Sequence, residues 1–123
     1  MKVWFYSSRV RRPLRYVDSY RKTVGGAETN VAIALTRLGH QTGWISKLGE
    51  DEFGLYVQNV IRGEGVDTSR VVFDDQAPTA VFFKERMTNQ DPNIYYYRHQ
   101  QQRVCYLLMI WTKTIFNRPN TFI

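Results

Sequence analysis

Residues 23–40, "TVGGAETNVAIALTRLGH", constrain the fold of this chain more than any other stretch. Apolar side chains recur there at helical spacing, which predicts a helix over residues 28–38, and Gly39 is well placed to end it. Gly25 and Gly26 stand just before this helix. A chain that turns through two glycines into a helix exposes backbone amides, which can donate hydrogen bonds to a ligand.

The start of this helix has two interpretations. As a binding site, its amides would donate to hydroxyls or to an anion, and Asn30 would offer a sugar both a donor and an acceptor. As a structural feature it is a tight turn and a helix cap, which a glycine pair alone favours. Neither the Walker phosphate loop nor the dinucleotide fingerprint matches, because the lysine of the first and the glycine spacing of the second are missing.

Further elements follow along the chain. We predict a buried strand over 42–49, a helix over 51–62, a turn and strand over 65–73, and a hairpin formed by 79–87 and 93–99 around a turn-rich hexapeptide. This order predicts an α/β fold, a parallel layer with a β-hairpin appended.

The charges are distributed unevenly. The net charge is +6 at pH 7, yet all 11 acidic residues lie between Asp18 and Asp91. Residues 16–97 are therefore net acidic, and the surplus of Lys and Arg sits at the two ends. A nucleic-acid-binding protein typically carries a basic stripe interleaved with aromatic side chains on folded elements. We therefore expect no nucleic acid partner.

The 123 residues have the size of one small domain. No stretch has the length or flanks of a signal peptide or a membrane helix. The one cysteine, Cys105, excludes an internal disulfide. We expect a cytoplasmic protein without a membrane partner.

The run "IYYYRH" is unusual for a strand. Alternation places Tyr96 and Arg98 on one face, and Tyr95 and Tyr97 on the other. An arginine beside tyrosine hydroxyls suits the carboxylate of a polyol, because its planar fork binds both oxygens. In isolation, an aromatic edge strand that ends on a solvated arginine is the alternative with more support.

Other polar residues favour structural roles. Glu50, Asp51 and Glu52 stand between glycines, but their spacing fits no calcium loop, and Asp51 is well placed to cap the second helix. His40 and His99 are interpreted as surface residues. We predict no metal ligand set and no nucleophile–base pair.

Several stretches together resemble one family: "GGAETNVAIALTRLG", "GWISKLGEDEFG", "GEGVDTSRV", "APTAVFFKER" and "YYYR". Over residues 13–98, their order is similar to the N-terminal part of ribokinase-type (PfkB) carbohydrate kinases, especially members that phosphorylate 2-keto-3-deoxygluconate. The resemblance implies a three-layer α/β sandwich with a small lid sheet over the sugar. It also implies transfer of the ATP γ-phosphate, assisted by Mg, to the 6-hydroxyl of this sugar acid.

The resemblance also implies site residues. The lid arginine, Arg98, would be the partner of the sugar carboxylate. Lid strands in this family often pair, which implies a possible homodimer. The implied sugar contacts are Gly26, Ala27, Glu28, Thr29 and Asn30 at the helix start, Phe82 as a lid aromatic, and Tyr96, Tyr97 and Arg98 on the lid strand.

The chain also departs from the family. Members have a second signature, a glycine-rich anion hole with a catalytic aspartate ("GAGD"), and a nucleotide site, and neither occurs in these residues. Phosphoryl transfer depends on positioning ATP and on stabilising the transferring charge. We therefore assign no catalytic, cofactor-binding or metal residue, and expect an inactive fragment of a kinase.

The two ends, 1–12 and 99–123, show neither helical nor strand periodicity. Shifting the reading frame of the encoding DNA permits "ESMVLF" near the start and "DLDEDYFQSAKYIH" in the tail, which resemble family segments. We hypothesise that both ends are out of frame. Residues 13–98 would then lack the first strand of their sheet, and exposed edges would make the product poorly soluble or molten. Sequencing the DNA tests this.

Alternatives remain open. The chain is either a kinase fragment or a non-catalytic module that binds a sugar acid or dimerises. Fructose and ribose are alternative substrates, because family members that act on them share the glycine pair.

Overall fold

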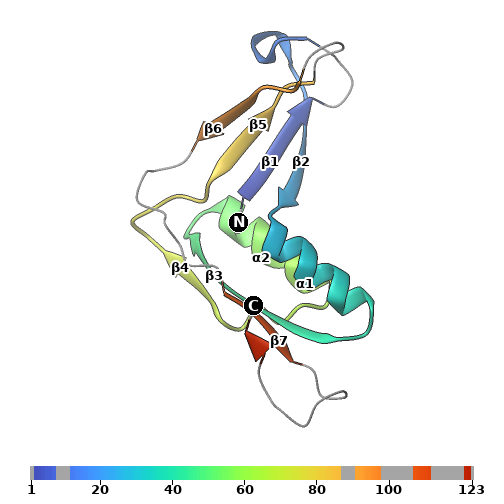
Figure 1. Ribbon diagram of the computed structural model, residues 1–123. Coiled ribbons are helices and arrows are strands. Elements are labelled where there is room, and N and C mark those ends of the chain that lie inside the picture. Colours follow the sequence, from blue (N-terminus) through green and yellow to red (C-terminus); the bar gives the residue numbers. More distant parts are fainter. Residues whose placement is uncertain (1, 8–11, 87–90, 98–106, 112–120, 123) are drawn as a thin grey trace.

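The structure, a computed structural model, describes residues 2–7, 12–86, 91–97, 107–111 and 121–122. Figure 1 shows two β-sheets at opposite ends of the molecule, with two α-helices between them. In chain order the elements are β1 (Lys2–Ser7), the 3-10 helix η1 (Leu14–Tyr16), β2 (Tyr20–Gly25), α1 (Ala27–Arg37), β3 (Gln41–Gly49), α2 (Glu52–Gly63), β4 (Val71–Asp74), β5 (Val81–Lys84), β6 (Ile94–Tyr97), β7 (Leu107–Trp111) and β8 (Thr121–Phe122).

The middle of the chain folds as its pattern predicts. Both helices, the strand between them, and β4 occur where they were expected, within a few residues at each end. β5 and β6 pair in antiparallel fashion, which confirms the hairpin. The α/β class is confirmed as a mixed arrangement, whereas a complete three-layer sandwich stays an expectation.

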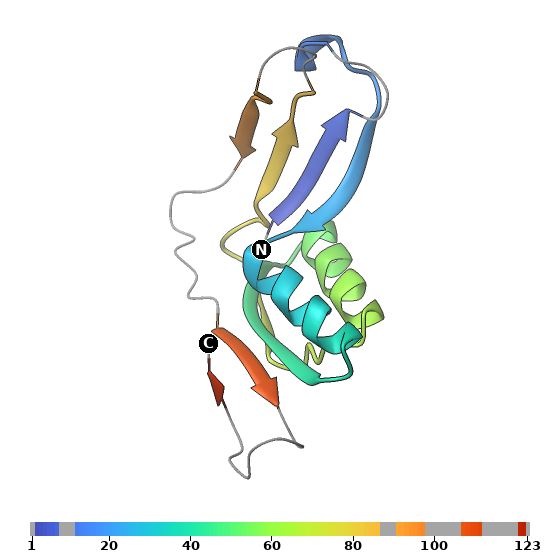
Figure 2. The same ribbon diagram turned by 45° about the vertical axis from the view of Figure 1, so that its right-hand side comes forward.

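The first sheet has the strand order β2-β1-β5-β6, and the second has the order β4-β3-β7-β8. In the first sheet, β1 and β5 run parallel and the other neighbours antiparallel. In the second, only β3 and β4 run parallel. The turned view in Figure 2 shows the two helices lying side by side between the sheets.

The start of the chain differs from expectation. Residues 2–7, which show no pattern we could interpret, form β1 between β2 and β5. The expectation that the first strand is missing is therefore corrected. Val3 and Phe5 point toward the helices, whereas Trp4 and Tyr6 point to the opposite face of the sheet. Because the side chains on both faces are apolar or aromatic, β1 shows no alternation of polar and apolar residues from which a strand could be predicted. The reading-frame hypothesis concerns the DNA and stays a prediction.

The tail differs in the same way. Residues 107–111 form β7, which pairs with β3, and β8 pairs with β7. The sequence of residues 99–123 shows no strand periodicity, so it did not predict these two strands. The run "LLMIW" is continuously apolar, and such a run has no period of two from which a strand could be predicted.

The core lies where the two helices pack against β3 and the first residues of β1. Its residues come from every neighbouring element, and α2 supplies side chains at helical spacing. Gly54 lets the first turn of α2 approach the end of β3, because a Cβ atom there would collide with the carbonyl oxygen of Gly49. Among the described residues, no helix is long and apolar enough to cross a membrane. The buried apolar residues of the core are Val3, Ala32, Trp44, Leu48, Val57, Ile61 and Val66.

Candidate functional site

An aromatic row crosses the face of the first sheet that points away from the helices, here called the outer face. Phe82 pairs in register with Trp4 on one side and with Tyr96 on the other, and paired residues share a face. Phe82 is fully buried, with its ring centroid 5.2 Å from that of Trp4 and 4.6 Å from that of Tyr96. The structure thus brings together Phe82 and Tyr96, two predicted site residues.

The start of α1 adjoins this row. A Cβ atom on Gly25 would stand 2.6 Å from Cδ1 of Trp4, so the indole lies directly on the backbone that enters the helix. Gly26 follows as the N-cap residue, without a side-chain capping bond, and its carbonyl accepts a hydrogen bond from the Asn30 amide at 3.0 Å. The glycine pair thus joins the outer face to the exposed first turn of α1.

The residues in the first turn of α1 differ in their exposure to solvent. Ala27 and Asn30 are exposed and Glu28 is half-buried. Thr29 is only 2% exposed, so its side chain faces the protein interior. Asn30 is therefore the polar side chain of this turn that is best placed to meet a ligand.

Two predicted site residues are not placed with the others. Tyr97 belongs to the opposite face of the sheet, where its ring packs edge-on against Phe83 with centroids 5.6 Å apart. Arg98 lies outside the described residues. Tyr96 and Tyr97 also border a hollow of about 620 Å³ that reaches Asp51 and Phe53 at the start of α2.

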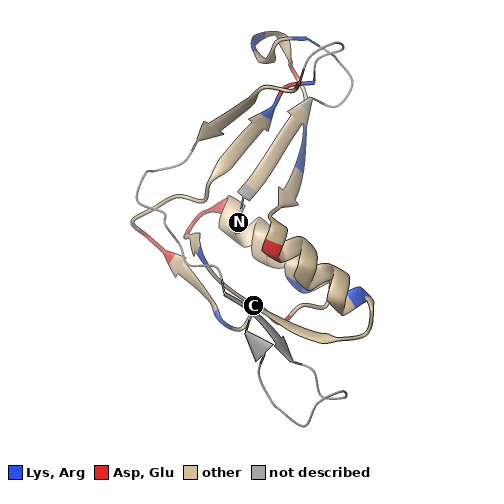
Figure 3. Ribbon diagram, viewed as in Figure 1, with Lys and Arg blue, Asp and Glu red and all other residues tan. Residues whose placement is uncertain are grey.

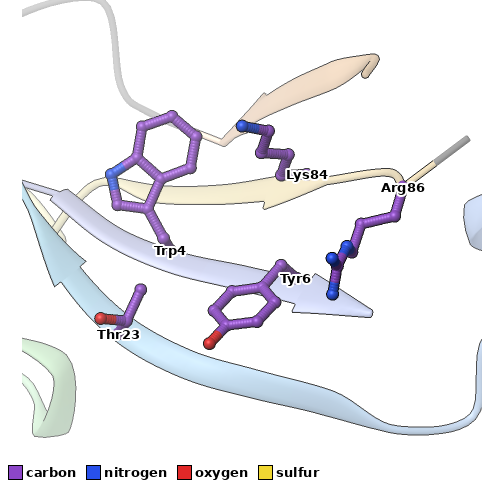
Figure 4. Close-up of a pocket in the computed structure, with 5 residues that line it drawn as sticks. All are labelled: Trp4, Tyr6, Thr23, Lys84 and Arg86. Atoms are coloured by element: carbon purple, nitrogen blue, oxygen red, sulfur yellow. The ribbon is translucent and has the colours of Figure 1, made fainter. Parts of the chain in front are cut away.

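The outer face contains a hollow that the sequence did not reveal. It measures about 330 Å³, and Figure 4 shows side chains from β1, β2 and β5, together with Arg86 just after β5, surrounding it. The local sequence signal for it is the positive charge after "VFF", and nothing in that segment indicates its pairing with the start of the chain. The lining residues are Trp4, Tyr6, Thr23, Lys84 and Arg86.

The acidic triplet is confirmed as a helix cap at Asp51. Its Oδ1 accepts a hydrogen bond from the Gly54 amide at 2.7 Å, and its Oδ2 accepts one from the Thr79 amide at 2.6 Å. Burial raises the pKa of Asp51, but these amides donate to the ionised form and hold the pKa below its usual value. Among the described residues, no three His, Cys, Asp or Glu side chains cluster as metal ligands would.

The comparisons with known proteins agree on one family. The sequence profile of the pfkB family carbohydrate kinases matches residues 1–104. The chain is 42% identical over 86 residues to a 2-dehydro-3-deoxygluconokinase of Bacillus subtilis, an overlap of 69% of this chain and 26% of that protein. It is 41% identical over 86 residues to fructokinase-1 of Zea mays, covering 70% of this chain and 27% of the relative.

A solved structure gives the same result. The fold superposes on a sugar kinase of Pyrococcus horikoshii in complex with ATP with a TM-score of 0.70 and 33% identity, over 77% of this chain and 31% of that one. The chain thus spans about a quarter of the length of the curated relatives, and about a third of this solved chain.

Proposed function

Because the chain belongs to the pfkB family of carbohydrate kinases, we propose that it carries the sugar-contacting part of a kinase for the sugar acid 2-keto-3-deoxygluconate. The observation that supports this most is the junction of the aromatic row with the start of α1. Phe82 and Tyr96 stand on the same face as the Trp4 indole, which lies on the backbone leading into the glycine-capped helix.

Each part of this junction suits one part of such a sugar. Backbone amides of the first turn of α1 and the exposed Asn30 side chain would bind hydroxyls. The ring of Tyr96, which is 56% exposed, would contact the apolar face of the carbon chain. Arg98, one residue beyond β6, would bind both oxygens of the carboxylate.

The choice of an acid sugar is supported by the Bacillus relative, whose name specifies 2-dehydro-3-deoxygluconate. The maize relative is a fructokinase of nearly equal identity, so fructose is the second candidate. Arg98 favours the acid, because fructose has no carboxylate for it to bind.

Family members bind ATP, as the Pyrococcus horikoshii complex illustrates. The residues present here do not fit the nucleotide and its magnesium. The sequence lacks a "GAGD" segment, and Asp51 of the acidic triplet already accepts two backbone hydrogen bonds. We therefore propose binding of the sugar without phosphoryl transfer for these 123 residues.

A calorimetric comparison of sugars tests the proposal. The chain is titrated with 2-keto-3-deoxygluconate, fructose and ribose, and ATP turnover is followed in a coupled assay. We expect binding of the sugar acid, weaker or no binding of the other two, and no turnover. If fructose binds more strongly than the sugar acid, fructose becomes the proposed ligand. ATP turnover would contradict the proposed absence of a nucleotide site.

A second role, pairing of two copies, is favoured by β6. β6 is an edge strand of the first sheet, and its three tyrosines are 41–61% exposed. Edge strands with exposed apolar side chains readily add a further strand. Light scattering after size exclusion should then give the mass of a dimer, and Tyr97→Lys should restore the monomer. A monomer at all concentrations would exclude this role.

A further inference from the structure

Among the described residues, β4 forms an open edge of the second sheet. It pairs with β3 on one side, and no described strand lies on its other side (Figure 1). The carbonyl of Asp74 accepts a hydrogen bond from the Glu50 amide at 2.9 Å. Since the backbone groups of successive strand residues point to opposite sides, the amide and carbonyl of Phe73 point to the open edge. This edge can therefore hydrogen-bond a further strand.

The face of β4 that points away from α2 offers an apolar contact. Val72 is 58% exposed there, and alternation places Asp74 on the same face. The carboxylate of Asp74 is already paired with the Lys47 ammonium at 2.6 Å. Because the one acid of β4 on this face has a partner, the face favours an apolar side chain of an added strand.

The opposite face of β4 borders a hollow at the start of α2. This hollow measures about 530 Å³ and is lined by Phe73 of β4 and by Leu55 of α2, which is 46% exposed. The acidic triplet Glu50, Asp51 and Glu52 completes its lining. The hollow is thus apolar on the side of the two elements and acidic at the turn between β3 and α2.

The charge of this hollow is open to a partner. Both carboxylate oxygens of Asp51 accept backbone hydrogen bonds, but Glu50 and Glu52 are exposed. No ion pair formed by the described residues includes either glutamate. Figure 3 shows red segments at the turn before α2 and at the end of β4. A cationic side chain that reaches this corner would therefore meet unneutralised negative charge.

We propose that β4 binds an extended, basic segment of a partner protein, which adds a strand to the second sheet. The segment would hydrogen-bond the backbone of Phe73. Every second side chain, a lysine or arginine, would enter the hollow, where its methylene stem covers Leu55 and its charge meets Glu50 and Glu52. The intervening apolar side chains would contact Val72. None of these residues belongs to the proposed sugar contacts, so this surface is independent of the proposed function.

NMR titration of the isotope-labelled full chain at low ionic strength tests the surface with three blocked pentapeptides. One alternates lysine and valine, the second has glutamate in place of lysine, and the third has proline in place of valine. We expect saturable shifts of the Phe73 amide with the lysine–valine peptide alone. The glutamate peptide is repelled by the hollow, and the proline peptide lacks amides that a strand needs. Equal shifts with either control peptide, or none with any peptide, would overturn the proposal.

Variants locate the bound peptide. Val72→Lys should weaken its binding at least tenfold, because it replaces the apolar contact with a like charge. Glu50→Gln and Glu52→Gln should each weaken it about threefold, as expected of an exposed ion pair, and the double variant about tenfold. Asp18→Asn, which removes one exposed carboxylate between η1 and β2, is the matched control and should bind normally. Normal binding by the double variant would refute the acidic hollow as the recognition feature.

A second copy of this chain is the alternative occupant of the edge. Light scattering after size exclusion distinguishes it, and we expect Val72→Lys to leave the mass of the chain unchanged. If Val72→Lys instead removes an oligomer that Tyr97→Lys leaves intact, β4 binds another copy and the proposed partner is overturned. Calorimetry with 2-keto-3-deoxygluconate should give the same affinity for Val72→Lys as for the unchanged chain, so the outcome for β4 does not depend on that for the sugar.

Discussion

Asp51 accepts a hydrogen bond from the backbone amide of Thr79 at 2.6 Å, across 28 residues of sequence. The same carboxylate caps α2, and the Thr79 hydroxyl accepts a bond from the Gly49 amide at 3.0 Å. The end of β3, the start of α2 and the segment entering β5 are therefore joined by two side chains. This junction links the two sheets through the start of α2.

Removing this carboxylate should destabilise the fold. Asp51→Ala removes a helix cap, worth about 0.5–2 kcal/mol, and leaves the buried Thr79 amide without its acceptor, at a cost of about 1–3 kcal/mol. We expect a loss of about 2–3 kcal/mol in urea unfolding. Asp51→Asn keeps one acceptor oxygen and should lose about half as much. An unchanged midpoint in Asp51→Ala would show that the junction contributes nothing.

Acid should weaken the fold through the same carboxylate and through Glu85. The amides of Thr79 and Gly54 hold the pKa of Asp51 below its usual value against the effect of burial, and the Leu14 amide lowers the pKa of Glu85. Groups with lowered pKa stabilise the fold above their unfolded pKa of about 4, and this contribution is lost as the pH falls through the folded pKa. The free energy of unfolding should therefore stay level from pH 7 to 5 and fall below about pH 4. In Asp51→Asn, the free energy of unfolding should fall less steeply below about pH 4. If this variant loses stability with falling pH as steeply as the unchanged chain, Asp51 does not contribute to the acid sensitivity.

The contact between Gly25 and Trp4 predicts a steric effect. Gly25→Ala places a methyl group against the indole and should cost about 1–3 kcal/mol, as overpacking usually does. Gly63→Ala, where no atom lies within 4 Å, is the control and should be neutral or slightly stabilising. In a double-mutant cycle, Trp4→Ala should relieve most of the cost of Gly25→Ala. Simple additivity of the two changes would refute the contact.

The two neighbouring tyrosines should behave differently. Tyr96→Ala removes a ring from the outer face and should weaken sugar binding about tenfold, equivalent to about 1.4 kcal/mol. Tyr97→Ala removes the edge-on contact with Phe83 and should lower stability by about 1 kcal/mol while binding is kept. Titration of both variants, with unfolding measured in parallel, makes this comparison. Equal losses of binding would show that Tyr97 also contacts the sugar.

Local pattern was sufficient to predict the elements of the middle of the chain. The α2 helix combines a capping aspartate with apolar side chains at helical spacing, and both signals lie within a dozen residues. The hairpin of β5 and β6 follows from two β-rich runs around a turn. The same local signals correctly predicted that Asp51 caps α2.

Long-range pairing was not predictable in this way. The outer-face hollow exists because β1 lies parallel to β5, which places Trp4 beside Phe82 and Tyr6 beside Lys84. No local feature of residues 2–7 encodes that register. Nor could the sequence show that Thr29 points inward while Asn30 is exposed, because the face of a helix start depends on what packs against it.

The measurement that tests the proposed function most directly is calorimetric titration of 2-keto-3-deoxygluconate into the full chain and into Arg98→Ala, with Arg70→Ala as the charge-matched control. We predict binding to the unchanged chain and to Arg70→Ala, and at least a tenfold loss in Arg98→Ala. No binding to the unchanged chain, or equal binding to all three, would contradict the proposal that this chain holds a sugar acid through Arg98.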